Sequence, residues 1–186
     1  MPDALIVVDM QTAFVYGPNA VPGGAEPAER IERVLGHARA AGALVVHLRN
    51  DGPDGALDEP GTPGWEPALP LRPGEFEFVV RKTMDDGFDG TRLGELLERY
   101  GVDRIIVCGV QSESCVAATA RTALARGLRV VLPHDTHATY DIPAVPGLAD
   151  AVAAHQVARV AEWSLGDEAE IVAHAADVEF IEATRP

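Results

Sequence analysis

Short uninterrupted apolar runs alternate along the chain with longer stretches of helical periodicity. An apolar run without polar alternation is typical of a strand buried on both faces of a parallel sheet. Such runs predict strands at Ala4–Val8, Ala43–Leu48, Phe76–Arg81, Ile105–Val107 and Leu128–Leu132, with a shorter strand at Ile171–Val172. The spacing of these runs leaves room for a helix between most neighbouring strands.

The helical stretches fill these intervals. The pattern predicts helices at Glu26–Ala41 and Thr91–Tyr100, a helix that carries Cys115 in its first turn and ends before Gly127, and a long helix from about Pro146 that places Leu148, Val152, Val157 and Val160 on one face. We expect the segment Val178–Ile181 to pack against the last strand. This alternation predicts a single three-layer α/β domain over residues 1–186, with helices on both faces of the sheet.

One long irregular stretch, residues 50–74, interrupts the alternation and is rich in proline and glycine. Loops of this length in compact domains are usually functional or mobile, so we expect a wall or lid of a pocket. Its one large aromatic residue, Trp65, is interpreted as an anchor that buries its ring against the body. Together with loops 15–25 and 134–146, this stretch is expected to set the choice of substrate.

Composition and charge narrow the class of protein. The 186 residues suffice for one domain with a proper core, and the formal net charge of −14 argues against nucleic acid or anionic membrane as a partner. No apolar run approaches the roughly 20 residues of a membrane span, and no secretion signal is apparent, so we expect a cytoplasmic location. The two cysteines, Cys108 and Cys115, do not suggest a disulfide framework, and Cys108 is interpreted as core packing.

Three chemically active residues follow predicted strands. Asp9 and Lys82 come directly after the first and third strands, and Cys115 follows the fourth strand past a polar turn. The carboxyl ends of parallel strands share one edge of a sheet, so all three residues project toward that edge. Taken singly, each has a plainer interpretation as a turn cap, a rim charge or a small buried side chain. Taken together, they predict nucleophilic chemistry in which Cys115 attacks a carbonyl, Asp9 removes the thiol proton and Lys82 favours nearby anions. We expect the helix N-terminus and Lys82 to lower the pKa of the thiol.

The segments VVDMQTAF, VVRKTMDDGF and CGVQSESCVAATARTALARGLRVVLPHDTHATYD resemble the isochorismatase-like cysteine hydrolase superfamily, which includes nicotinamidases, N-carbamoylsarcosine amidohydrolases and streptothricin hydrolases. The resemblance implies a Rossmann-like six-stranded parallel sheet in the order 3-2-1-4-5-6 and a catalytic triad of Asp9, Lys82 and Cys115. It also implies a cis peptide between Val110 and Gln111, and an oxyanion hole made by the backbone N–H groups of Gln111 and Cys115. The ligand crevice would open between Asp9 and Cys115, where the strand order reverses.

Departures from the family refine these expectations. Nicotinamidases hold a metal through an Asp-x-His pair after strand two and a further histidine, whereas the matching stretch here is Asn50-Asp51-Gly52. We therefore expect no catalytic metal and no cofactor. The run from Gly61 to Trp65, with Gln111 to Cys115, is most similar to the streptothricin-hydrolase-type branch. His134 and His137 could bind metal or act as bases, but are interpreted as shaping and polarising their loop.

The function that these observations favour is hydrolysis of a C–N bond in a small amide, lactam or carbamoyl compound through a thioester on Cys115. Two alternatives remain: a vinyl-ether hydrolase of the isochorismatase type, which does not need the cysteine, and a non-catalytic small-molecule-binding or thiol-sensing protein. The resemblance implies a homo-oligomer, either a dimer or a tetramer. We expect weaker substrate contacts from Gln11, Phe14, Trp65 and His137.

Overall fold

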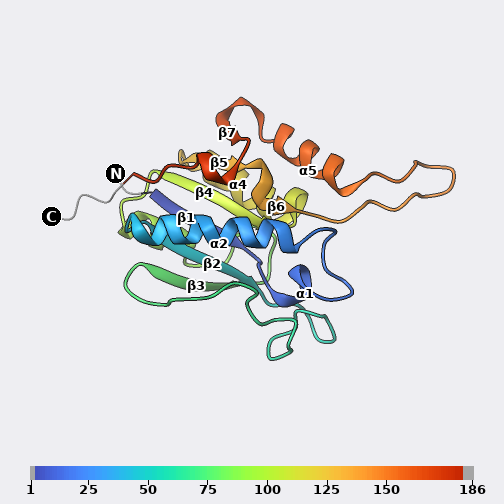
Figure 1. Ribbon diagram of the computed structural model, residues 1–186, viewed down its shortest axis with the longest axis horizontal. Helices are drawn as coiled ribbons and strands as arrows, with labels where there is room; N and C mark the ends of the chain where they lie inside the picture. The colour runs from blue at the N-terminus through green and yellow to red at the C-terminus, as the bar shows by residue number, and fades with distance from the viewer. Residues whose placement is uncertain (1–2, 182–186) are drawn as a thin grey trace.

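A parallel sheet forms the centre of the computed structural model, which describes residues 3–181 (Figure 1). Its main strands are β1 (Asp3–Val8), β2 (Leu44–Asn50), β3 (Glu77–Lys82), β4 (Arg104–Val110), β5 (Arg129–Pro133) and β7 (Ala169–Val172). They run in the order β3-β2-β1-β4-β5-β7, which confirms the predicted order with β7 as the sixth strand. A two-residue strand that the sequence pattern did not predict, β6 (His137–Ala138), pairs with the end of β4.

Helices cover both faces of this sheet. They are α1 (Thr12–Val15), α2 (Ala25–Ala40), α3 (Leu93–Arg99), α4 (Ala117–Ala125) and α5 (Ala154–Trp163). Short helical turns complete the set: a π-helical turn η1 (Ser112–Val116), and the 3-10 turns η2 (His134–Thr136), η3 (Gly166–Glu168) and η4 (Ala175–Asp177). The predicted fold class, three-layer α/β with helices on both faces, is therefore confirmed.

The surroundings of strand β1 show why the strands of this sheet have unbroken apolar sequences. Ala4, Ile6 and Val8 face a core shared with α3 and α4. Leu5 and Val7 face a second core, shared with α2. Because both faces of the sheet are covered, no position of this strand can be polar and solvated without loss of buried apolar area.

The chain beyond β7 joins the α2 side of the sheet without forming another strand. Val178 is buried in the same core as α2, and Phe180 packs against that core. The backbone N–H of Ile181 donates to a carboxylate oxygen of Asp3 at 2.7 Å, which ties this segment to the start of β1.

The predicted helix from Pro146 is wrong in its first part. Residues 141–153 instead form an extended hairpin with antiparallel bridges Ile142↔Val152 and Val145↔Ala149, and α5 begins only at Ala154. The cause is the pair Pro146-Gly147: Gly147 has φ +77°, and the N–H of Leu148 bonds to the carbonyl of Val145 at 3.0 Å. Proline followed by a glycine with positive φ is the signature of a tight turn, which overrode the apolar spacing.

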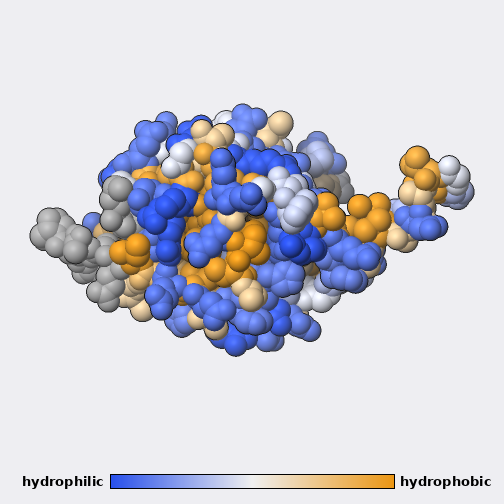
Figure 2. Space-filling model, turned by 90° about the horizontal axis from the view of Figure 1, so that it is seen from above, coloured by the Kyte–Doolittle hydropathy of each residue, from blue (hydrophilic) through white to orange (hydrophobic). Residues whose placement is uncertain are grey.

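This hairpin stands away from the body of the protein in both whole-molecule views (Figures 1 and 2). Its apolar side chains are exposed rather than placed on a buried helix face, and Leu148 at the turn is 80% exposed. Within residues 3–181, no helix is long and apolar enough to cross a membrane.

Candidate active site

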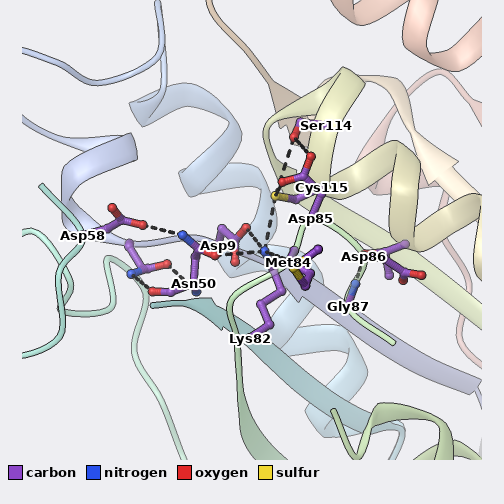
Figure 3. Close-up of polar contacts among 12 residues, drawn as sticks. Asp9, Asn50, Asp58, Lys82, Met84, Asp85, Asp86, Gly87, Ser114 and Cys115 are labelled. Carbon is purple, nitrogen blue, oxygen red and sulfur yellow. Dashed lines mark hydrogen bonds and ion pairs between the residues drawn. The ribbon is translucent and has the colours of Figure 1, made fainter. Parts of the chain in front are cut away.

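Three strand ends bring Asp9, Lys82 and Cys115 together (Figure 3). Asp9 directly follows β1, Lys82 is the last residue of β3, and Cys115 lies in the η1 turn after β4. The Lys82 Nζ atom lies 2.8 Å from Asp9 Oδ2 and 3.3 Å from Cys115 Sγ. The structure therefore places the three residues at one edge of the sheet, as their positions after parallel strands predict.

Unusual backbone geometry at the ends of β1 and β4 positions the acid and the thiol. Asp9 has φ +49°, a left-handed conformation that aspartate tolerates better than most residues. Gly109 has φ +123°, and a Cβ atom there would lie 2.0 Å from the carbonyl oxygen of Val8. Only glycine therefore lets β4 run this close to β1. The peptide between Val110 and Gln111 is cis, as the family resemblance implies.

Lys82 contacts both of the other residues of the predicted triad. Its side chain is fully buried, and its ammonium group also donates to the carbonyl of Met84 at 3.1 Å and to Asn50 Oδ1 at 3.5 Å. Burial alone would lower the pKa of Lys82, but the negative charge of Asp9, and that of Cys115 when its thiol is ionised, keep that pKa above its ordinary value. The ammonium group therefore stays charged.

Asp9 is only half paired. Its Oδ2 atom binds Lys82, while Oδ1 is buried and has no hydrogen-bond partner among the described residues. Burial raises the pKa of Asp9, and the charge of Lys82 only partly offsets this. A buried carboxylate with a raised pKa and a free lone pair is equipped to take a proton.

The expected lowering of the thiol pKa is wrong for the free protein. Burial, and then the negative charge of Asp9, raise the pKa of Cys115 to about 12, although Lys82 acts in the opposite direction. The prediction considered the cation and the helix end but not the burial of the sulfur or the nearby anion. The resting thiol is therefore protonated at neutral pH, so a base is needed to activate it.

A cavity of about 150 Å³ opens beside the sulfur. It is lined by Asp9, Phe14, Asn50, Asp85, Val110, Gln111, Ser114 and Cys115. Of the four weaker substrate-contact predictions, only Phe14 borders this cavity. Asn50, Asp85 and Ser114 were not predicted as site residues.

Asp85 is the most consequential of the residues that sequence reasoning missed. Its side chain is exposed, accepts a hydrogen bond from Ser114 Oγ at 2.8 Å, and has one oxygen 3.8 Å from Cys115 Sγ. The neighbouring Asp86 accepts from Thr122 Oγ1 at 2.7 Å, which fixes this loop to α4. An acidic pair so soon after Lys82 was a usable signal, because a loop that leaves the carboxyl end of a strand tends to border the ligand crevice.

Gln11 and Trp65 hold the long loop in place instead of lining the cavity. The side-chain amide of Gln11 donates to the backbone carbonyl of Asn50 at 3.0 Å and accepts from its N–H at 2.8 Å. The indole N–H of Trp65 donates to Asp51 at 2.9 Å, and the Arg49 guanidinium lies 3.1 Å from the ring centre. This arrangement agrees with the interpretation of Trp65 as an anchor.

His137 lies behind the η1 turn rather than in the cavity. Its Nδ1 atom is 2.8 Å from Ser112 Oγ, and its Nε2 atom is 3.0 Å from Glu162 Oε1. All three side chains are buried, so the contacts join β6 and α5 to the turn that carries Cys115. Its geometry matches the interpretation that this histidine shapes its surroundings.

The stretch after β2 offers no ligand set for a metal. Asp51 forms an ion pair with Arg81 at 2.7 Å and accepts the Trp65 indole N–H. Asn50 supplies an amide, whose nitrogen donates to Asp58 Oδ2 at 2.6 Å. The side chains at these positions are thus engaged with each other or with cations of the protein.

Cys108 occupies the core position that its place in β4 predicts. Its side chain is fully buried, and burial raises the pKa of the thiol far above its ordinary value. The two cysteines therefore differ in access: Cys115 borders a cavity, whereas Cys108 does not reach solvent.

Known proteins are similar to this chain in sequence and in fold. The isochorismatase domain model matches residues 3–164. Two streptothricin hydrolases from Streptomyces noursei are 63% and 62% identical to this chain over 98% and 96% of its length, and the chain spans 73% and 64% of theirs. A solved isochorismatase structure from Pseudomonas putida KT2440 is similar with a TM-score of 0.85 and 32% identity, covering 95% of this chain and 90% of that one.

Proposed function

Because the chain belongs to the isochorismatase family of hydrolases, we propose that it is a cysteine-dependent amidohydrolase that opens a C–N bond in a small amide, lactam or carbamoyl compound. The observation that carries this proposal is the Cys115 sulfur, which borders a cavity and lies 3.3 Å from a lysine paired with Asp9. A thiol, a base and a fixed cation are the groups that acyl transfer through a thioester requires.

The first half of the reaction forms the thioester. As the sulfur of Cys115 attacks the substrate carbonyl carbon, the thiol proton passes to the unpaired oxygen of Asp9. The tetrahedral intermediate then collapses with cleavage of the C–N bond, and Asp9 returns the proton to the departing nitrogen. Coupling proton removal to attack suits a thiol whose pKa is about 12, because the thiolate need never accumulate.

The second half consumes water. Asp9 removes a proton from a water molecule, which attacks the thioester carbonyl, and the proton passes to the sulfur as the acid leaves. Lys82 remains charged throughout and stabilises whichever of its two neighbours is negative. We assign the oxyanion hole to the backbone N–H groups of Gln111 and Cys115, because both residues line the cavity.

The lining of the cavity favours a small substrate without negative charge at its reacting end. The cavity holds about 150 Å³, and the exposed carboxylate of Asp85 lies beside the sulfur. Lys82, the cation nearest the sulfur, is already paired with Asp9. An anionic group at this point would meet a carboxylate without a free counter-ion, whereas a neutral or cationic amide would not.

We further propose that residues 1–186 act as one domain and that the protein is a homo-oligomer, a dimer or a tetramer. The exposed apolar side chains Ile142, Val145 and Leu148 on the hairpin, with Trp163 on α5, support self-association. Light scattering of the purified protein tests this, and a monomer at micromolar concentration would contradict it.

The experiment that tests the enzymatic proposal measures release of ammonia or free amine from a panel of amides, lactams, ureides and carbamoyl amino acids, with streptothricin included because the Streptomyces noursei relatives bear its name. Wild type is compared with Cys115→Ala. The matched control is Cys108→Ala, which removes the buried thiol and should leave turnover intact. If Cys115→Ala retains full activity, the thioester mechanism is refuted and an ether-hydrolase mechanism that needs no cysteine gains support.

A further inference from the structure

We propose that His134, His137 and Glu162 form a binding site for one divalent transition-metal ion of the Zn²⁺ type, separate from the candidate active site. The three residues come from η2, β6 and α5, and α5 lies over the end of the sheet at which β6 is labelled (Figure 1). One ligand atom from each residue lies within 4.8 Å of the other two. Each ligand position is thus held by a different element of the fold.

The contacts within this group converge on one oxygen. His134 Nδ1 and His137 Nε2 lie 2.5 Å and 3.0 Å from Glu162 Oε1. The other carboxylate oxygen, Oε2, faces Arg159 at 3.3 Å. Arg159 therefore pairs with Oε2, and Oε1, which both histidine nitrogens already approach, is the oxygen that an ion would bind.

The residues around the ligands are arranged as in protein metal sites. A metal-bound histidine usually has its second ring nitrogen held by a hydrogen bond, and Ser112 Oγ lies 2.8 Å from the second nitrogen of His137. The His137 and Glu162 side chains are almost completely buried, so these two ligands are fixed before an ion arrives.

Access to the site comes from the side of His134. The His134 side chain is 54% exposed and, with Glu162 and Trp163, borders a surface hollow of about 900 Å³. An ion could enter from this hollow, and its fourth coordination position would open toward it. Three protein ligands with one open position is the arrangement that Zn²⁺ adopts in many non-structural sites.

The ligand types select the class of ion. Two imidazoles and one carboxylate suit Zn²⁺ and its neighbours in the first transition row, whereas Mg²⁺ and Ca²⁺ prefer oxygen ligands alone. A tetrahedral ion with bonds of about 2.0 Å sets its ligand atoms roughly 3.3 Å apart. His137 is already near that separation from Glu162, and the exposed His134 is the ligand that must swing outward.

Ion binding would change one hydrogen bond to η1, the turn that carries Cys115. A metal on His137 Nε2 requires the ring proton to lie on Nδ1, which then donates to Ser112 Oγ. Without the ion, Nε2–H can donate to Glu162, and the Ser112 hydroxyl donates to Nδ1. The ion therefore reverses the direction of the hydrogen bond between His137 and η1.

The test uses the full-length protein, treated with a chelator and then titrated with ZnCl₂ in a calorimeter. A thiol can also bind Zn²⁺, so the titration is performed in the Cys115→Ala variant as well as in wild type. The decisive variant is His134→Gln, because an exposed side chain can be changed without disturbing the fold. The matched control is His155→Gln, which changes an exposed histidine in the first turn of α5 that belongs to no metal-ligand group within residues 3–181.

We expect a single Zn²⁺ per chain in wild type, Cys115→Ala and His155→Gln. We expect the dissociation constant to rise by at least about tenfold in His134→Gln. Co²⁺ in place of Zn²⁺ should give the visible absorption of a tetrahedral site, and this band should be lost in His134→Gln. Equal binding by His134→Gln and wild type, loss of binding in Cys115→Ala, or no binding by wild type would each overturn the proposal.

Discussion

A buried carboxylate lies at each end of strand β3, and the two differ in how many hydrogen-bond donors surround them. At its first residue, Glu77 accepts hydrogen bonds from the Arg39 guanidinium to both oxygens at 2.8 Å and from the Arg72 N–H at 2.7 Å, and His47 lies 3.1 Å away. At its last residue, Lys82 contacts only one oxygen of Asp9, and the other oxygen has no hydrogen-bond partner among the described residues. One carboxylate is saturated with donors and the other is not.

The pKa values of the two groups follow this difference. Burial would raise the pKa of Glu77, but the hydrogen bonds from Arg39 and Arg72 outweigh it and lower that pKa to about 2. Burial raises the pKa of Asp9, and Lys82 does not fully offset it. A saturated carboxylate stabilises the fold and is chemically inert, whereas a half-paired one keeps the capacity to accept a proton.

The largest expected effect is the loss of activity caused by the substitution Asp9→Asn. Asparagine keeps the shape of the side chain but cannot take the thiol proton. We expect kcat/KM to fall by about 10²–10⁴-fold, the usual contribution of a general base. Steady-state kinetics, with circular dichroism to check folding, measure this effect. A folded variant within tenfold of wild type would exclude Asp9 as the base.

The converse effect is expected in Glu77→Gln, which leaves the mostly buried guanidinium group of Arg39 beside a neutral partner. Removing one member of a buried ion pair costs about 3–5 kcal/mol. We expect the free energy of unfolding to fall by about that amount, with kcat/KM of the folded variant unchanged. Urea denaturation and kinetics together measure both quantities. A large drop in kcat/KM without a loss of stability would show that the two clusters are not distinct in role.

The contribution of Glu77 to stability should depend on pH, and the direction follows from its pKa. The pKa of Glu77 is about 2 in the folded protein and 4.5 ordinarily, so its stabilising contribution is complete above pH 4.5 and is lost as the pH falls through 2. We expect the difference in melting temperature between wild type and Glu77→Gln to be constant from pH 7 to 5. It should then shrink toward zero near pH 2. A difference that persists at pH 2 would mean that the pairing of the carboxylate does not cause it.

The smallest effect concerns substrate contact. Phe14 borders the cavity and Trp65 does not. Phe14→Leu removes apolar contact area, and losses of this size in a pocket cost about 1–3 kcal/mol. We expect a KM about tenfold higher with little change in kcat, whereas Trp65→Phe should keep the wild-type KM. Equal effects in both variants would mean that the substrate extends over the long loop.

The features that the sequence could predict depend on local pattern and chain order. Unbroken apolar runs predicted the main strands because both faces of the sheet are covered, and a parallel arrangement then required Asp9, Lys82 and Cys115 to share an edge. The helix from Pro146 was mispredicted because a Pro-Gly turn outweighed apolar spacing. Asp85 was missed because its placement depends on the docking of its loop onto α4 through Asp86 and Thr122.

The thiol pKa was mispredicted for a related reason. The helix end and the cation can be inferred from positions along the chain, but the burial of Cys115 depends on how the surrounding elements pack. The same holds for the Oδ1 atom of Asp9, which has no hydrogen-bond partner within the described part of the chain, because that depends on how the neighbouring elements pack.

The measurement that tests the central claim most directly is the pH dependence of Cys115 alkylation by iodoacetamide, followed by mass spectrometry so that only this thiol is counted. We predict a midpoint far above the ordinary thiol value of about 8.5, because burial and Asp9 raise the pKa of Cys115 to about 12. In Asp9→Asn the midpoint should fall, since Lys82 remains and the neighbouring anion is gone. A wild-type midpoint at or below about 8.5 would contradict the account, because the resting enzyme would then hold a thiolate paired with Lys82 and would not need Asp9 to activate it.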